Sequence, residues 1–225
     1  MQEVESITGG RFGGCLELDS DVPLCRGFGS STSDVLAAIW AVADAFRLVL
    51  PRATVARLAV RAETASDSLM FDQTAVLFAH REGELIEDFG AALPPVHVLG
   101  FGTGVPVATL TYRPARYTEP ELDHFGELRA MLRQAVAAQD TSLMGEVATA
   151  STWINQQHMP IPHLEQVCAV GAEVGAVGVH TAHSGDICGI LFERDVPDLG
   201  YRAETAQERL RGLGYNEQWR FTTGD

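Results

Sequence analysis

The order of hydrophobic patterns in the second half of the chain constrains the fold more than any other feature. From residue 96 onward, a strand pattern, a run of helical patterns, two strand patterns, a helical pattern and a final strand pattern follow one another. This order is that of a split βαβ sandwich. The predicted helices are near residues 118–138, 141–156, 162–174 and 202–212, and the predicted strands are "PVHVLGF", "GAVGVH", "ICGILFE" and "EQWRFT".

The first half of the chain has a different organisation. Residues 30–48 repeat at helical spacing, and residues 54–63 form a second helical pattern after Pro51. The stretches "AVLFAH" and "GELIEDF" predict a hairpin, and "GGCLELDSDVP" at residues 13–23 alternates like a strand. We therefore expect an α+β fold in two lobes, residues 1–95 and 96–225, divided near "LPP".

Composition excludes several functions. The 225 residues include 46% hydrophobic residues, enough for a sizeable core, and carry a net charge of −14. No stretch of the sequence gathers bases, so we expect no nucleic-acid partner. The chain has no lysine, which excludes a Walker A lysine, a Schiff-base lysine and a catalytic lysine.

The sequence also gives expectations about location and buried residues. It contains no run of about 18 apolar residues and starts without a signal-peptide pattern, so we expect a cytoplasmic protein without a membrane span. The four cysteines are far apart and are expected to be buried thiols. Trp153 and Met144, on apolar faces of the middle helices, are expected in the core.

A glycine-serine stretch, "RGFGSSTSD" at residues 26–34, raises the first functional hypothesis. Ser31 and Asp34 are spaced as a capping pair, so a helix is expected to begin within "SSTSD". Gly27 and Gly29 then precede a helix N-terminus, where free backbone N–H groups favour phosphate. The hydroxyls of residues 30–32 add donors and potential magnesium ligands. An ordinary capped helix after a glycine turn remains the alternative.

Two further stretches carry polar residues that could be functional. Glu63 and Asp67 are a carboxylate pair at the end of the second helix, suited to phosphoryl transfer or, alternatively, to a solvated helix end. In "HTAHSGD", residues 180–186, a metal site and a Ser-His hydrolase are both disfavoured, because a turning strand does not keep one face and no nucleophile elbow is present. The stretch "GFGTG" lacks the following helix of a dinucleotide fingerprint.

These stretches together resemble the GHMP small-molecule kinases. "PLCRGFGSS" is similar to their Pro-x-x-x-Gly-x-Gly-Ser-Ser motif, and "ETASDS", "LFAH" and "AHSGDICGILFE" are similar to motifs of the L-threonine kinase branch, which makes O-phosphothreonine for the cobalamin side chain. The matches span roughly residues 20–220 in the right order. The resemblance implies a two-lobed GHMP-kinase-like fold, ATP and Mg²⁺ as substrate and cofactor, and phosphorylation of a small hydroxy amino acid.

The resemblance also assigns roles to residues of this sequence. It implies that the catalytic carboxylate is Asp67 and that the metal ligands are Ser31 and Glu63. The nucleotide-binding residues that it implies are Arg26, Gly27, Gly29, Ser30, Ser31, Thr32, Ser184 and Gly185. The turn at Ser184 and Gly185 would be the third kinase motif, packed beside the phosphate loop.

This sequence departs from the family pattern at its start. Relatives carry a longer N-terminal region with a Pro-x-Ser-x-Gly-Glu motif, so we expect an incomplete N-terminal lobe. "ETASDS" has one residue more than the branch pattern, and Arg26 replaces a common lysine. Two hypotheses follow: a kinase for L-threonine or a similar hydroxy amino acid, or a noncatalytic remnant of the fold that binds a ligand or partner. The oligomeric state is not predicted.

Overall fold

A four-stranded antiparallel sheet organises the second half of the chain in the computed structural model, which describes residues 9, 13–23, 26–104, 115–183 and 185–224. The spatial order of its strands is β4-β5-β3-β6, the order of a ferredoxin-like split βαβ sandwich. The strands are β3 (Val96–Gly102), β4 (Gly178–Thr181), β5 (Ile187–Glu193) and β6 (Gln218–Thr222). The predicted α+β class and the C-terminal architecture are thus confirmed.

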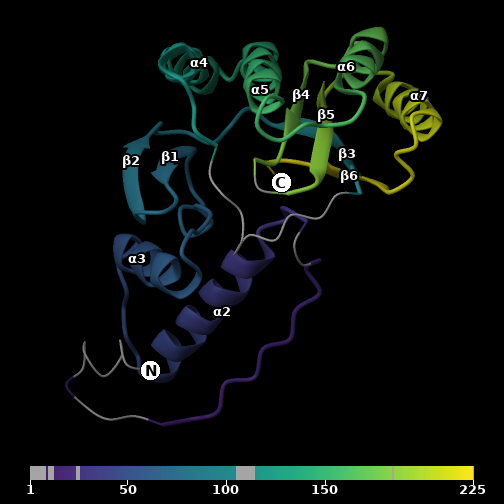
Figure 1. Ribbon diagram of the computed structural model, residues 1–225. Coiled ribbons are helices and arrows are strands. Elements are labelled where there is room, and N and C mark those ends of the chain that lie inside the picture. The colour runs from purple at the N-terminus through teal and green to yellow at the C-terminus, as the bar shows by residue number, and fades with distance from the viewer. Residues whose placement is uncertain (1–8, 10–12, 24–25, 105–114, 184, 225) are drawn as a thin grey trace.

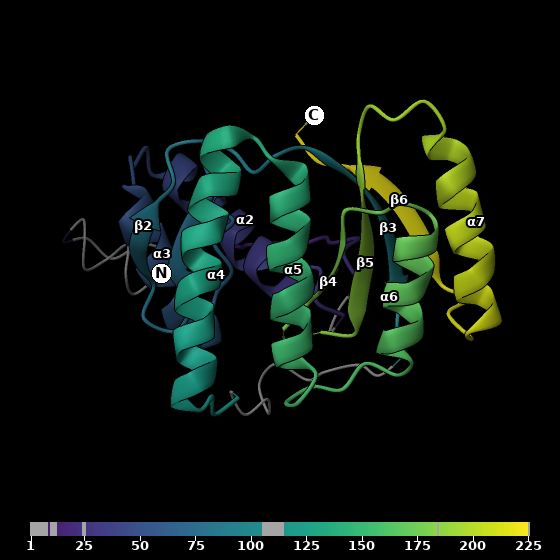
Figure 2. The same ribbon diagram turned by 90° about the horizontal axis from the view of Figure 1, so that it is seen from above.

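Four helices form one layer over this sheet (Figure 1; Figure 2). They are α4 (Glu119–Ala138), α5 (Thr141–Asn155), α6 (Leu164–Glu173) and α7 (Leu199–Gly212). Local sequence fixes where two of them begin: Thr118 and Glu121 form a capping box at α4, and the Asp140 carboxylate accepts the Leu143 N–H at 3.0 Å at α5. Each predicted helix and strand of residues 96–225 is therefore present.

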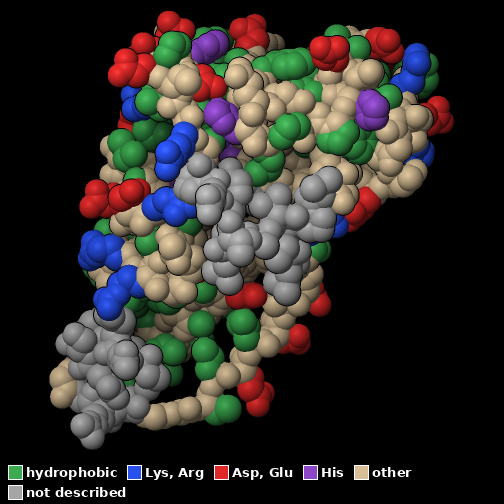
Figure 3. All heavy atoms as spheres, in the orientation of Figure 1, with side chains coloured by type: hydrophobic (Ala, Val, Ile, Leu, Met, Phe, Trp, Pro, Cys, Tyr) green, Lys and Arg blue, Asp and Glu red, His purple; other side chains and the backbone are tan. Residues whose placement is uncertain are grey.

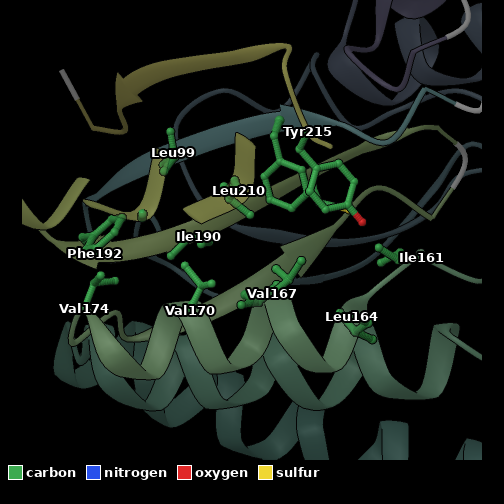
Figure 4. Packing of buried hydrophobic residues seen from close by; sticks show 14 residues of the cluster. Leu99, Ile161, Leu164, Val167, Val170, Val174, Ile190, Phe192, Leu210 and Tyr215 are labelled. Atoms are coloured by element: carbon green, nitrogen blue, oxygen red, sulfur yellow. The ribbon is translucent and has the colours of Figure 1, made fainter. Parts of the chain in front are cut away.

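The main core lies between the sheet and helices α6 and α7. Leu99, Phe101, Ile190 and Phe192, on the central strands β3 and β5, are completely buried. Figure 4 shows these strands facing residues of α6 such as Val167. Burying a side chain of this size contributes about 1.5–3 kcal/mol, so this core stabilises the half of the molecule that carries the "HSGD" turn.

The first half of the chain packs two helices and a hairpin around a smaller core. The helices are α2 (Ser30–Ala45) and α3 (Arg52–Glu63), and the antiparallel hairpin is β1 (Val76–Ala79) with β2 (Glu84–Asp88), as predicted. Leu36 of α2 and Val55 of α3 belong to this core, and among the described residues none of its buried side chains belongs to another hydrophobic cluster. The lobe boundary near residue 95 stays a prediction.

Three expectations about strands and buried residues are wrong. Residues 13–23 form no strand; they are mostly exposed, and Figure 1 shows them running outside the body of the fold. No strand in the described part of the chain pairs with them, and a ladder requires a partner. Trp153 is 40% exposed, although Met144 is buried as expected. Cys15 is exposed, whereas Cys188 is buried and Cys168 is half-buried; Cys25 lies outside the described residues.

Acidic side chains are prominent on the surface (Figure 3), as the net charge of −14 leads one to expect. On the face shown in Figure 3, acidic side chains gather along the layer of helices α4 to α7, and arginines lie beside the N-terminal helices and hairpin. No helix among the described residues has the length and apolarity required to span a membrane.

Candidate active site

The glycine-serine stretch forms a loop that ends at the N-terminus of α2. Gly27 and Gly29 have φ angles of 97° and 72°, a left-handed conformation that glycine adopts without strain. Gly29 is the N-cap residue, so the predicted Ser31–Asp34 capping pair is wrong, although α2 does begin within "SSTSD" at Ser30. Because Gly29 has no side chain, it cannot cap the first-turn N–H groups, which leaves them available to an anion.

The three hydroxyl residues that follow differ in exposure. Ser31 is exposed, whereas Ser30 and Thr32 are buried. The Thr32 hydroxyl donates to Oε1 of Glu63 at 2.8 Å and accepts the backbone N–H of Asp67 at 3.0 Å. Thr32 therefore joins the start of α2 to the end of α3 and to the turn that follows it.

Asp67 lies against the glycine-serine loop. A Cβ atom placed on Gly29 would be 3.1 Å from Oδ2 of Asp67, so glycine leaves room for this carboxylate. Desolvation and the nearby Glu63 raise the pKa of Asp67, while His80 partly opposes the change. The residue keeps part of its surface exposed to solvent, which is compatible with contact to a substrate. A raised pKa makes a carboxylate a better proton acceptor than an ordinary aspartate.

The "HSGD" turn packs against the other side of the loop. A Cβ atom on Gly185 would overlap the backbone of Arg26 and Gly27, and the Asp186 N–H donates to the Arg26 carbonyl at 3.0 Å. The turn therefore lies beside the glycine-serine loop, as the family resemblance implied for this motif. Ser184, also predicted to bind nucleotide, lies outside the described residues. His183 contacts Ser151 of α5, with 3.3 Å between Nε2 and Oγ.

Arg26 is held by two carboxylates. Its Nε donates to Oδ1 of Asp186 at 2.5 Å, and its two terminal nitrogens donate to Glu217 at 3.0 and 2.7 Å. These contacts raise the pKa of the guanidinium, mainly through Glu217 and then Asp186. The guanidinium is thus engaged within the protein, and its predicted role in nucleotide binding remains a prediction.

Sequence reasoning missed the partners that come from the end of the chain. Phe28, between the two loop glycines, packs against Trp219 of β6 with 5.1 Å between ring centroids and the rings tilted by 54°, and Gly100 leaves room for the Trp219 indole. Glu217 and Trp219 carry no local motif that links them to the loop. Only the strand order indicates that Glu217 and Trp219 lie near the loop, because it places β6 beside β3.

The donor set at the start of α2 fits a magnesium ion bound with nucleotide. Glu63 offers one carboxylate and Ser31 an exposed hydroxyl, and in the described part of the chain no three His, Cys, Asp or Glu side chains converge. Mg²⁺ commonly takes one or two protein oxygens, substrate phosphates and water rather than a full protein cage. These ligand roles remain predictions.

The N-terminal part of the chain is similar to the GHMP kinases, and its fold is similar to that of solved small-molecule kinases. Residues 2–80 match the family model described as GHMP kinases N terminal domain. The structure of homoserine kinase from Cytophaga hutchinsonii superimposes with a TM-score of 0.65 at 15% identity, covering 91% of this chain and 68% of that chain. The predicted resemblance is therefore confirmed, and the structural likeness establishes the fold.

The curated relatives of similar sequence are kinases that are named for small hydroxy amino acids. It is 28% identical over 190 residues to L-threonine kinase from Citrobacter freundii, covering 83% of this chain and 65% of the relative. It is also 28% identical over 184 residues to homoserine kinase from Shouchella clausii, covering 76% of this chain and 59% of the relative. The chain thus spans about two thirds of the length of the curated L-threonine kinase that it matches.

Proposed function

We propose that this protein is a small-molecule kinase that transfers the γ-phosphoryl group of ATP to the hydroxyl of a small amino acid, with L-threonine as the first candidate. The observation that carries the proposal is the convergence of Gly29, Thr32, Glu63 and Asp67 at the N-terminus of α2. Relatives that act as L-threonine and homoserine kinases support the acceptor class. Such a kinase would work in the cytoplasm.

The loop would bind the nucleotide phosphates through backbone N–H groups. Gly27 and Gly29 let an anion approach the main chain, and the positive end of the α2 dipole favours its charge. A magnesium ion held by Glu63 and Ser31 would neutralise charge on the phosphate oxygens. The loop needs no lysine for this purpose, in agreement with the sequence.

Asp67 would orient the acceptor hydroxyl and accept its proton. The hydroxyl oxygen attacks the γ-phosphorus, the bond from that phosphorus to the β–γ bridging oxygen breaks, and ADP leaves with the bond electrons. Through its two hydrogen bonds, Thr32 would keep Glu63 and the Asp67 turn at fixed positions relative to the loop. Phosphoryl transfer depends chiefly on this kind of positioning and charge neutralisation.

The test is ADP release by the purified chain with ATP, Mg²⁺ and a panel of L-threonine, L-homoserine and L-serine. We expect turnover with at least one acceptor, and Asp67→Asn should lower kcat by roughly 10²-fold or more, the effect of a lost general base. Asp72→Asn is the matched control, because Asp72 is exposed and pairs with Arg52 instead.

Glu63→Gln tests the proposed magnesium ligand separately from the proposed proton acceptor, Asp67. Because the change weakens a proposed magnesium ligand, it should raise the Mg²⁺ concentration needed for half-maximal rate. Nucleotide binding without turnover of any acceptor would overturn the proposal and favour a noncatalytic ligand-binding protein. If Asp67→Asn kept the full kcat, Asp67 would not be the group that accepts the proton.

A further inference from the structure

The carboxylate of Asp186 is buried with one oxygen unused. Asp186 is 3% exposed, and its Oδ1 accepts the Arg26 Nε–H at 2.5 Å. Its backbone is fully engaged, since its N–H donates to Arg26 and its carbonyl accepts the Thr103 N–H at 2.7 Å. Oδ2 has no hydrogen-bond partner among the described residues. A buried carboxylate oxygen without a donor is costly, so it indicates a ligand at this position.

A small cavity with both polar and apolar walls lies at this carboxylate. Its volume is about 50 Å³, and its wall includes Asp186, Thr103, Thr181, Cys188 and the segment 159–161. This volume is a few times the roughly 10–15 Å³ that accommodates one water molecule, so the cavity has room for a small ion but not for an amino acid. Among the described residues the Thr181 hydroxyl makes long contacts only: it lies 3.3 Å from Ala182 O and 3.4 Å from Ile187 O, and it accepts the Cys188 thiol at 3.4 Å.

The charges around the cavity favour a cation. Oδ1 of Asp186 pairs with the Arg26 guanidinium, whose other side pairs with the exposed Glu217, so among the described residues Oδ2 of Asp186 is left without a positive partner. A single carboxylate with hydroxyl oxygens is a poor site for Mg²⁺, which demands near-ideal octahedral geometry and dehydrates reluctantly. One compensating charge and neutral oxygen donors suit a monovalent cation.

We propose that this cavity binds a monovalent metal cation, K⁺ or Na⁺, with Oδ2 of Asp186 as its charged ligand and the Thr103 and Thr181 hydroxyls as neutral ligands. The site is separate from the magnesium ligands proposed at Ser31 and Glu63, and it does not depend on the proposed kinase activity. Because Asp186 holds the Arg26 carbonyl and Gly185 packs on Gly27, the ion stabilises the turn that supports the phosphate loop.

The test is the thermal unfolding midpoint at constant ionic strength in KCl, NaCl or tetramethylammonium chloride. Tetramethylammonium is too large for the cavity and controls for general salt screening. A ligand that binds only the folded state raises the midpoint with the logarithm of its concentration above Kd. We expect a saturable rise of a few degrees with K⁺ or Na⁺. Equal midpoints in all three salts would show that the cavity holds water alone and would overturn the proposal.

Three variants assign the effect to this cavity. Thr181→Val removes a hydroxyl ligand while keeping side-chain shape and the Arg26–Asp186 pair, and should weaken cation binding about tenfold, or roughly 1.4 kcal/mol. Asp186→Asn should weaken it more, and Thr181→Val keeps the test informative if Asp186→Asn does not fold. Glu217→Gln is the control, because Glu217 pairs with Arg26 outside the cavity and its loss should leave a saturable cation response. The same half-saturating concentration in wild type, Thr181→Val and Asp186→Asn would place the ion elsewhere and refute the site.

Discussion

The hydroxyl of Thr32 donates a 2.8 Å hydrogen bond to the carboxylate of Glu63, and this contact joins the first turn of α2 to the last residue of α3. The same oxygen accepts the Asp67 N–H, so one buried side chain positions both proposed functional carboxylates. A threonine at the start of a helix is commonly read as a capping residue. Here its structural role is to connect three separate segments of the site.

Thr32→Val should therefore destabilise the fold and the site together. Valine keeps the shape of threonine but leaves the Asp67 N–H without an acceptor, a loss of about 1–3 kcal/mol for a buried donor. Urea denaturation measures this change in the free energy of unfolding, and the ADP-release assay measures the accompanying fall in turnover. The matched control is Thr205→Val on α7, where the hydroxyl bonds only to the Tyr201 carbonyl of its own helix. It should change stability by no more than about 0.5 kcal/mol. Equal stability of the Thr32→Val variant and wild type would show that the two bonds contribute nothing.

The ionisation of Asp67 gives a second prediction. Desolvation and the Glu63 charge raise the pKa of Asp67 in the folded protein. Carboxyl NMR titration of the chain without ligands should find this pKa above the ordinary aspartate value of about 3.9. Glu63→Gln should lower it, because the neighbouring charge is removed, and His80→Gln should raise it. Asp72→Asn should leave it unchanged. If the pKa of Asp67 did not change in Glu63→Gln, the two carboxylates would not interact electrostatically.

The same shift determines how stability depends on pH. Because the folded-state pKa of Asp67 is raised, the folded protein holds this proton more tightly than the unfolded chain does. The stabilising contribution is fully present below the unfolded-state pKa and is lost as pH rises through the folded-state pKa. Asp67→Asn should therefore be at least as stable as wild type at neutral pH, even as it loses activity. Denaturation curves at several pH values test this, and a clear loss of stability at neutral pH would contradict it.

Gly185→Ala should disturb the phosphate loop. A Cβ atom there would overlap backbone atoms of Arg26 and Gly27, which cannot move aside as a flexible side chain can. A displacement of about 1 Å at a positioned group can cost roughly 10²-fold in rate, so we expect a large fall in kcat/KM for ATP. Gly126→Ala is the control, because this exposed helical glycine has open space around it. It should stabilise the protein by about 0.4–1 kcal/mol without changing the rate. Similar kinetics of the two variants would rule out the close packing of turn and loop.

The two carboxylates on Arg26 should differ in their contributions to stability. Arg26→Met leaves Asp186 buried without its cation, and removing one partner of a buried pair costs about 3–5 kcal/mol. Glu217→Gln should cost about 0–1 kcal/mol, because the Glu217 side chain is 58% exposed. Unfolding free energies of both variants test this order. Equal losses would show that burial of Asp186 does not govern the cluster.

Most elements could be predicted from the sequence, but their contacts could not. Hydrophobic periodicity located helices α2 to α7 and the strands, because period and length are local properties of a chain. Periodicity also predicted a strand at residues 13–23, where the structure has none, because a strand exists only with a partner to pair with. The start of α2 was correct although the predicted cap was not, since Gly29 occupies the N-cap position.

For the site, the sequence by itself determined the residue types and their local spacing: two glycines before a helix, hydroxyls in its first turn, and two carboxylates four residues apart. Tertiary structure decided which of them meet. It placed Asp67 against Gly29, directed Arg26 to Asp186 and Glu217, and left one oxygen of Asp186 facing a small cavity. The physical reason is that propensity and spacing act between near neighbours, whereas hydrogen bonds and ion pairs between distant segments exist only after the sheet and helices have packed.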